Sequence, residues 1–203
     1  MIDKRMELYN AKEFGNIREV IKNAVKEHPD NNAFILKETN GKDVEYKNIT
    51  YTKFDKQIDC LGTALVSKGL KGKRIAVIGK NCYEWIVSYL SVVNGTGIVV
   101  PLDKGLPEKE IETSLIRSES EAIIFEDDYI DMIKNIKSNN QTKVTKFICM
   151  NKQDEFENIY KLIDEGEKLL QQGNKEFIES EINNEEMSIL LFTSGTTSAA
   201  KAV

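Results

Sequence analysis

The stretch "RIAVIGKNCYEWIVSYLSVVNGTGIVVPLD", from Arg74 to Asp103, decides the fold. Its first six residues form a short apolar run with β-branched side chains, which is typical of a buried strand. Apolar residues then recur at helical spacing, at Trp85, Val87, Leu90 and Val93. A second β-branched run, "GIVVPLD" from Gly97 to Asp103, follows them. A strand, a helix and a strand in this order predict a parallel β-α-β unit.

The helices on either side carry start and stop signals. A helix is expected to begin at Thr52, because Thr52 and Asp55 have the spacing of a capping box. Its buried face would carry Phe54, Ile58, Leu61 and Leu65. Gly69 would end it. By the same argument, Asn81 with Glu84 three residues later is expected to cap the helix inside the opening stretch.

The alternation of strands and helices continues downstream. Pro107 and the acids after it suit the first turn of another helix. Further strands are predicted at "EAIIFED" (Glu121 to Asp127) and "KFICM" (Lys146 to Met150). The helix between them would pass through Ile130, Ile133 and Ile136. Short, nearly continuous apolar strands that alternate with helices predict an α/β fold, with a largely parallel sheet flanked by helices on both faces.

The segment 151–184 is more polar, and its core "ENIYKLIDEGEKLLQQG" has a helical pattern. We expect it to be a peripheral excursion, after which the chain returns to the sheet at Met187. No segment with the composition of a linker marks a second domain, and the sequence has no internal repeat. Residues 1–203 are therefore expected to form part of one domain.

The composition excludes several classes of function. Of the 203 residues, 40% are apolar and 30% charged, which is globular, and the net charge of −5 with scattered lysines argues against a nucleic-acid partner. One histidine and three widely separated cysteines offer no metal-ligand cluster, so no metal site is predicted. No apolar segment is long enough to span a bilayer and no signal sequence opens the chain, so we expect no transmembrane segment and a cytoplasmic protein.

Several single residues have structural rather than functional interpretations. Buried structural thiols are expected for Cys60, Cys82 and Cys149. Trp85 is expected to pack in the core rather than to stack on a ligand, and His28 is expected to lie at a helix end, where a cation complements the helix dipole. Asp127 and Asp128 are more simply explained as helix-start acids than as metal ligands. The acidic run "ESEINNEE" should lie on a solvated face.

The end of the sequence, "ILLFTSGTTSAAKAV" from Ile189 to Val203, has the composition of an anion-binding loop. Successive N–H groups in such a turn form a concavity that suits anions, and Lys201 adds a compact positive charge. Phosphate is the natural ligand, and a solvent-exposed turn between two strands is the alternative. A Walker-type loop is excluded, because it needs glycine before the lysine and Ser or Thr after it, whereas Ala200 and Ala202 flank Lys201.

This terminal stretch resembles the signature of the adenylate-forming superfamily, which comprises acyl- and aryl-CoA synthetases, adenylation domains of peptide synthetases, and luciferases. The signature runs roughly Thr-Ser-Gly-Thr-Thr-Gly-x-Pro-Lys-Gly and forms a mobile loop over the ATP phosphates. "ITYTKFDKQIDCLGTAL" (Ile49 to Leu65) is similar to the family's helix entry. The stretch from Arg74 to Asp103 is similar to the family block that comes after this helix entry. It looks closest to the corresponding block of long-chain fatty-acid–CoA ligases. The three blocks occur in the family's order over most of the chain.

The resemblance implies the N-terminal subdomain of the acyl-CoA synthetase-like fold and a set of phosphate-contacting residues. These are Thr193, Ser194, Gly195, Thr196, Thr197, Ser198 and Lys201. In the family the loop joins two strands, so "KAV" would begin the return strand. Three positions depart from the signature: Ser198 and Ala202 replace glycines and Ala200 replaces proline. If position 198 requires a positive φ, serine there costs roughly 1 kcal/mol.

The resemblance also implies that residues 1–203 are the N-terminal part of an AMP-binding domain, because family members run on well beyond this point. The whole enzyme would use ATP, Mg²⁺ and coenzyme A to activate a carboxylic acid, with a fatty acid favoured, as an acyl-adenylate and then a thioester. No catalytic residue is expected within this chain, which should be inactive alone. Two alternatives stay open: a stand-alone adenylation domain that loads a carrier protein, and a non-catalytic module that binds a nucleotide or a partner.

Overall fold

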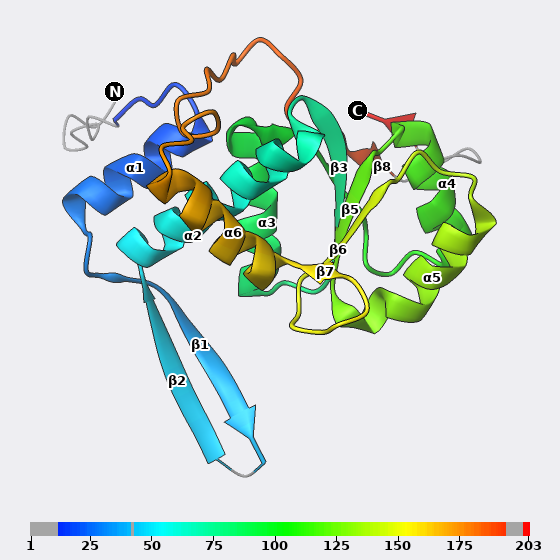
Figure 1. Ribbon diagram of the computed structural model, residues 1–203, viewed down its shortest axis with the longest axis horizontal. Coiled ribbons are helices and arrows are strands. Elements are labelled where there is room, and N and C mark those ends of the chain that lie inside the picture. Colours follow the sequence, from blue (N-terminus) through cyan, green and yellow to red (C-terminus); the bar gives the residue numbers. More distant parts are fainter. Residues whose placement is uncertain (1–11, 42, 194–200) are drawn as a thin grey trace, which may run out of the picture.

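The computed structural model describes residues 12–41, 43–193 and 201–203 (Figure 1). Its centre is a five-stranded parallel sheet in the order β4-β3-β5-β6-β7. The strands are β3 (Lys73–Ile78), β4 (Gly97–Pro101), β5 (Ala122–Phe125), β6 (Lys146–Cys149) and β7 (Glu157–Asn158). The sheet confirms the predicted parallel α/β fold, and the short strand β7 joins the four predicted strands.

Helices cover both faces of this sheet. α2 (Tyr51–Leu65), α3 (Tyr83–Ser91) and α6 (Ile159–Gln171) lie over one face, and α4 (Glu108–Ser118) and α5 (Ile130–Asn139) lie over the other. Alternate side chains of a strand point to opposite faces. Two core clusters result: the first lies between the sheet and α2, α3 and α6, and the second lies between the sheet and α4 and α5. In β3, Ile75 and Val77 accordingly belong to the first cluster, while Ala76 and Ile78 belong to the second. Because both faces are buried, the strands are continuous apolar runs rather than alternating ones.

The start of α2 differs from the expected one by two residues. Its N-cap is Thr50, whose Oγ1 accepts a hydrogen bond from the backbone N–H of Lys53 at 3.2 Å. The hydroxyl of Thr52 instead donates to the carbonyl of Pro29 at 2.9 Å. The predicted capping box is therefore wrong, because a tertiary contact engages Thr52 while a residue with the same hydroxyl stands two positions earlier. Gly69, at φ 82°, ends the helical turn that continues α2, as predicted.

Two other helix starts shift by one residue each. α3 follows Cys82, which has no side-chain cap bond, so the predicted Asn81 cap is wrong. α4 begins after Pro107, whose extended backbone makes it the N-cap residue rather than the first helical residue. Asp127 and Asp128 lie in a 3-10 turn (Asp127–Tyr129) that leads into α5, which confirms them as helix-start acids.

α6 is part of the core and not a peripheral excursion, which corrects the prediction for segment 151–184. Ile159 and Leu162 are buried in the first cluster. Gly166 lies so close to α2 that an added Cβ would meet the carbonyl oxygen of Cys60 at 1.8 Å. The many polar residues of α6 misled the prediction, because they lie on its exposed face and only the opposite face is buried. The chain then returns to the sheet at Ile189, which forms a parallel bridge with Val99 of β4.

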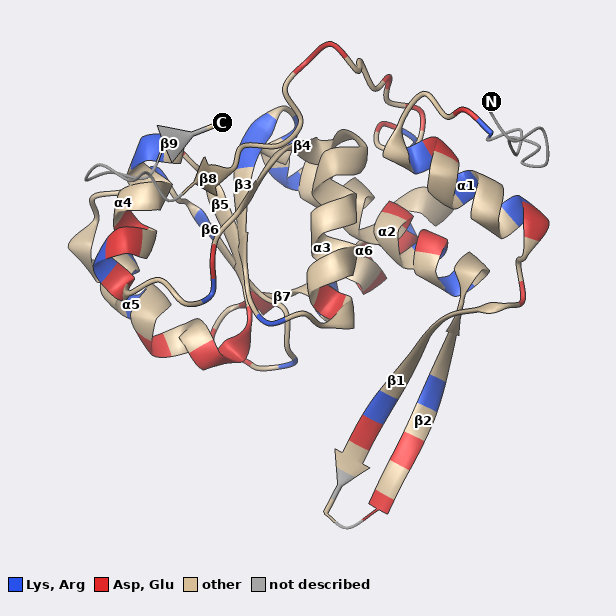
Figure 2. Cartoon of the chain, turned by 180° about the vertical axis from the view of Figure 1, so that it is seen from behind, with Lys and Arg blue, Asp and Glu red and all other residues tan. Residues whose placement is uncertain are grey.

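An antiparallel hairpin, which the sequence analysis did not predict, projects from the body (Figures 1 and 2). β1 (Asn32–Asn40) pairs with β2 (Asp43–Thr50), and Gly41 in their connection has φ 64°. An Asn-Gly pair between two β-branched runs is a hairpin signal that was available in the sequence. α1 (Ile17–Glu27) precedes the hairpin and packs beside α2. His28 lies at the C-terminus of α1, as predicted.

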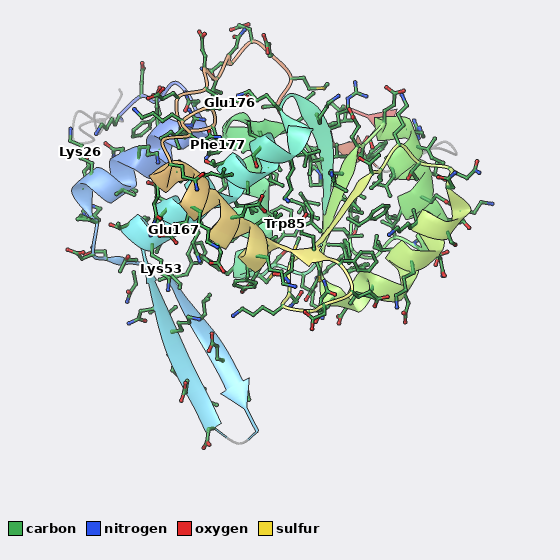
Figure 3. All side chains as sticks on the ribbon, in the orientation of Figure 1. Lys26, Lys53, Trp85, Glu167, Glu176 and Phe177 are labelled. Carbon is green, nitrogen blue, oxygen red and sulfur yellow. The ribbon has the colours of Figure 1, made fainter. Side chains whose placement is uncertain are left out.

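The residues from 174 to 188, called here the connecting segment, link α6 to the sheet edge and pass close to α1 (Figure 1). Arg18 of α1 holds this segment by donating to the carbonyls of Phe177 at 2.9 Å and Ser180 at 2.7 Å. Its guanidinium also lies 5.3 Å from the ring centroid of Phe177, a fully buried side chain (Figure 3). Burial lowers the pKa of Arg18, and the carboxylates of Asp59 and Asp55 oppose that shift.

Candidate functional site

The structure places the two ends of the predicted phosphate loop opposite each other. β8 (Phe192–Thr193) pairs antiparallel with β9 (Lys201–Ala202), so that Thr193 faces Lys201 across the ladder. The predicted arrangement, in which a strand enters the loop and a return strand begins at Lys201, is confirmed. Thr193 is exposed. The other predicted contacts lie outside the described residues: Ser194, Gly195, Thr196, Thr197 and Ser198.

The chain reaches this hairpin from the edge of the sheet. The backbone N–H of Val99 donates to the carbonyl of Ser188, and the N–H of Leu190 donates to the carbonyl of Val99, both at 2.9 Å. Leu191 and Val203 then exchange two backbone hydrogen bonds, at 2.7 and 2.8 Å. The start of the loop is thus an extension of the sheet, and main-chain bonds on both sides fix it.

Side chains anchor the hairpin to the second face of the sheet. Leu190 is buried in the core cluster beneath α4 and α5, and Phe192 packs against the same cluster. The guanidinium of Arg117, in the last turn of α4, lies 5.8 Å from the ring centroid of Phe192. The apolar residues Leu190 and Phe192 therefore supply the anchor, and Thr193, which follows them, is exposed.

Sequence reasoning did not identify Arg117 or Arg18 as residues of this framework. Arg117 contacts a residue 75 positions away and Arg18 contacts residues about 160 positions away. No local pattern marks either of them, because each is an isolated arginine on an amphipathic helix. Only the tertiary fold brings them to their partners.

The other candidate residues have structural surroundings. Trp85 is half-buried and stacks on Tyr89 with ring centroids 5.2 Å apart, which confirms packing rather than an open stacking platform (Figure 3). Cys60 and Cys149 are buried, and Cys82 is half-buried. Burial raises the pKa of all three thiols, so none is activated as a nucleophile.

Acidic groups are dispersed through the described ranges 12–41, 43–193 and 201–203. Within them no three His, Cys, Asp or Glu side chains converge on a possible metal position. Asp128 instead pairs with Lys80, and Glu126 accepts from the backbone N–H of Lys80 at 2.8 Å. Most of the acidic run before Met187 is exposed, as predicted. None of the helices in this part of the chain has the length and apolar content needed to cross a bilayer.

Comparison with known proteins gives concordant matches. The sequence model of the family described as "AMP-binding enzyme" matches residues 21–203. Fatty acyl-CoA synthetase A of Dictyostelium discoideum is 28% identical over 171 residues, which cover 80% of this chain and 25% of that protein. Long chain acyl-CoA synthetase 5 of Arabidopsis thaliana is 28% identical over 196 residues, which cover 91% of this chain and 29% of that protein. The chain therefore spans little more than a quarter of the length of these relatives.

Solved structures share the fold. The anthranilate CoA ligase AuaEII, in complex with anthranoyl-AMP, superposes with a TM-score of 0.74 at 16% identity. The superposition covers 98% of this chain and 36% of that protein. The sheet, its two helical layers and the terminal β8–β9 pair thus occur together in an architecture that is also found in a CoA ligase.

Proposed function

The chain belongs to the AMP-binding enzyme family, and we propose on this basis that residues 1–203 are the N-terminal part of an ATP-dependent acid–thiol ligase. The proposed substrate is a fatty acid, because two of the relatives are a fatty acyl-CoA synthetase and a long chain acyl-CoA synthetase. One observation carries the proposal: the antiparallel pairing of Thr193 with Lys201, which closes a hydroxyl-rich sequence between two anchored strands.

The proposed reaction has two steps. In the first, a carboxylate oxygen attacks the α-phosphorus of ATP, the bond to the bridging oxygen breaks, and pyrophosphate leaves. In the second, the thiol of coenzyme A attacks the acyl carbon and AMP leaves. This chain would contribute to the first step by binding the β- and γ-phosphates through loop N–H groups, the hydroxyls of Ser194, Thr196 and Thr197, and the ammonium group of Lys201. Such contacts accelerate the reaction by positioning ATP and neutralising the charge on the departing group.

The proposed contribution of this chain is phosphate binding, and the residues that the structure describes offer no group for the remaining chemistry. No convergent acidic cluster that could hold Mg²⁺ is present in residues 12–41, 43–193 and 201–203. Burial raises the pKa of the three thiols, which disfavours the thiolate that an acyl acceptor would need. We therefore propose that residues 1–203 alone do not form an acyl-adenylate.

Exchange of labelled pyrophosphate into ATP, with a panel of carboxylic acids, tests this proposal on the full-length gene product. Lys201→Ala should lower the exchange rate at least tenfold, because it removes the cation beside the leaving group. Lys146→Ala is the matched control, since Lys146 is an exposed lysine that, like Lys201, begins a strand, but it lies in β6. Equal exchange in the two variants would contradict the role of Lys201, and exchange by residues 1–203 alone would contradict their inactivity.

Two further measurements refine the proposal. Transfer of the acyl group to coenzyme A, but not to a phosphopantetheinylated carrier protein, supports the ligase over a stand-alone adenylation domain. Ser198→Gly should leave turnover unchanged or raise it, because glycine adopts a positive φ without strain if the loop requires one at that position. A clear decrease in turnover would show that the Ser198 hydroxyl has a role of its own.

A further inference from the structure

The guanidinium group of Arg18, in the first turn of α1, lies among oxygens of two other chain segments. Nη1 donates to the carbonyls of Ser180 at 2.7 Å and Ile178 at 3.3 Å. Nη2 lies within hydrogen-bonding distance of the carbonyls of Phe177 and Asn94 and of the hydroxyl of Ser180. The two terminal nitrogens make all of these bonds, and the buried Nε has no partner among the residues that the structure describes. One side chain thus joins α1 to the turn after α3 and to the connecting segment.

The groups around this guanidinium are packed without spare room. Gly95, in the turn after α3, has φ 122°, and a Cβ added there would meet Ser180 Oγ at 2.3 Å and Arg18 Nη2 at 2.6 Å. A Cβ added to Gly62 of α2 would meet the buried ring of Phe177 at 2.3 Å (Figure 3). The position of the connecting segment relative to the turn and to α2 is therefore closely fixed at this point.

Beyond this point the chain has little else to hold it. No residue from 178 to 189 is buried. In the middle of that stretch, Asn184 donates to the carbonyl of Gly15, just before α1. At its far end, Ile189 forms an isolated bridge with Val99 of β4, made by two backbone hydrogen bonds. A segment with few buried contacts opens locally at low cost, so its position depends on the contacts at its ends.

The same guanidinium also bears on the other strand of that bridge. The carbonyl of Asn94, which Arg18 contacts, lies three residues before Gly97, the first residue of β4. Val99 of β4 is the bridge partner of Ile189, and the strand that contains Ile189 continues into β8, where the predicted phosphate loop begins. Arg18 therefore fixes, relative to each other, the chain segments that lead into both strands of the bridge.

We propose that Arg18 is a positioning residue for ATP binding, because it holds in place the strand through which the chain enters the phosphate loop. The inference rests on the proposed function, since it takes this loop to bind the ATP phosphates. Arg18 acts through the main chain and not by contact with the nucleotide. Lysine cannot replace it, because a compact ammonium group lacks the planar fork that reaches acceptors on two segments at once.

Pyrophosphate exchange by the full-length gene product tests the inference, because it gives separate KM values for ATP and for the acid. Arg18→Lys keeps the charge but loses the fork. It should raise the KM for ATP at least fivefold and leave the KM for the acid within twofold. A role in overall stability alone would lower the amount of active enzyme, and so the apparent kcat, without changing either KM. That result, or an equal rise in both KM values, would overturn the inference.

Two further variants sharpen this test. Lys22→Met is the matched control on the same helix, because Lys22 lies one turn after Arg18 but pairs with Asp55 and Asp59 of α2. It should leave the KM for ATP within twofold. A rise as large as that of Arg18→Lys would assign the effect to general loosening of α1 and overturn the inference. If Arg18→Lys fails to fold by circular dichroism, Ser180→Ala, which removes only the hydroxyl acceptor, should raise the KM for ATP about threefold. An unchanged KM would then overturn the inference.

Hydrogen–deuterium exchange separates this inference from the proposed function, because it needs no turnover. The backbone amides of Leu190 and Leu191 are hydrogen-bonded at the loop entry. In Arg18→Lys they should exchange at least tenfold faster, while the amides of β5 keep the wild-type rate. If the wild type exchanges no pyrophosphate with any acid, the proposed function fails, and the amide rates still decide whether Arg18 positions the strand. Unchanged rates at Leu190 and Leu191 would overturn the inference even in an active enzyme.

Discussion

The central sheet and the β1–β2 hairpin are both built of β-strands, but they are stabilised in opposite ways. In β5, Ile123 and Ile124 are fully buried on the two faces of the sheet. In the hairpin, Ile35 and Tyr46 are 61% and 67% exposed. The sheet joins strands that are distant in sequence and buries them under helices, whereas the hairpin pairs neighbouring segments and projects into solvent (Figure 2). Burial between layers, rather than strand pairing, therefore stabilises this domain.

The hairpin nevertheless has two distinct faces. Residues directly opposite each other in an antiparallel pair share a face. Lys37 opposite Tyr46 and Thr39 opposite Val44 are therefore on the same side as Ile35. The other face carries the Glu38–Lys47 ion pair. The alternation of a strand is present, as in the sheet, but no second layer covers the apolar side among the described residues.

Truncating the same side chain in the two regions gives the largest contrast. Ile124→Ala should lower the free energy of unfolding by about 2–5 kcal/mol, because it leaves a cavity between β5 and the first helical layer. Ile35→Ala should change it by at most about 0.5 kcal/mol, because that side chain is mostly in water. Urea denaturation of both variants measures the difference. Similar losses would mean that the hairpin is an integral part of the core.

A glycine substitution tests how closely the helical layer fits. Gly166→Ala should destabilise the fold by about 1–3 kcal/mol, since the new Cβ would meet the carbonyl oxygen of Cys60 and α6 would have to move. In an exposed helix the same change stabilises by up to about 1 kcal/mol, so even its sign is informative. Gly105→Ala is the control, because the nearest atom to its added Cβ, in Asp103, is at an ordinary 3.4 Å. A gain in stability for Gly166→Ala would refute the close fit of α6 to α2.

The sequence predicted the sheet better than the helices that cover it. β3, β4, β5 and β6 are continuous apolar runs, and this pattern is specific for strands buried on both faces. α6 was misjudged because its exposed face is rich in Lys and Glu, although Leu162 on its other face is fully buried. Helix starts were misplaced where tertiary contacts decide, as at Thr52, whose hydroxyl bonds to Pro29. The hairpin was overlooked although its Asn-Gly signal was present.

The candidate site was likewise predicted only in part from the sequence. The strand entry at Phe192–Thr193 and the return at Lys201–Ala202 followed from local pattern and family resemblance. The contact of Arg117 with Phe192 did not, because it depends on the packing of α4 against the end of the chain. Sequence alone therefore predicts which residues are suited to bind a phosphate, but not which residues hold them in place.

The buried thiol of Cys60 gives the stability of the core a pH dependence. Burial, with a smaller contribution from the Glu167 carboxylate, raises the pKa of this thiol from 9.0 to about 11. The unfolded chain loses the proton first as the pH rises, so the free energy of unfolding should decrease between pH 9 and 11. Urea denaturation across this range should show a smaller decrease for Cys60→Ala than for the wild type, whereas Ile35→Ala should keep the wild-type slope. An unchanged slope in Cys60→Ala would exclude this thiol as the cause.

The smallest effect is expected from ion pairs, and it again differs between the regions. Glu38 and Lys47 of the hairpin lie 3.3 Å apart, and their side chains are 55% and 53% exposed. Lys22 of α1 contacts the half-buried carboxylates of Asp55 and Asp59 on α2 at 2.8 and 2.6 Å. Burial lowers the pKa of Lys22, but its two hydrogen bonds outweigh that effect and the net shift is upward. The attraction between Lys22 and these carboxylates is therefore present at neutral pH and is lost as the pH rises through the raised pKa of Lys22. It is also lost in acid, where Asp59 takes up a proton, because burial raises the pKa of Asp59 more than Lys22 lowers it.

Double-mutant cycles separate the two interactions. The cycle of Glu38→Ala with Lys47→Ala should give a coupling energy of about 0–0.5 kcal/mol that disappears in 1 M salt, because both groups are solvated and salt of that concentration screens beyond about 3 Å. The cycle of Lys22→Met with Asp59→Asn should give a larger coupling that salt reduces less, because the surrounding helices exclude part of the solvent. If the hairpin pair gave the larger coupling, or if salt removed both equally, exposure would not be what distinguishes the two regions.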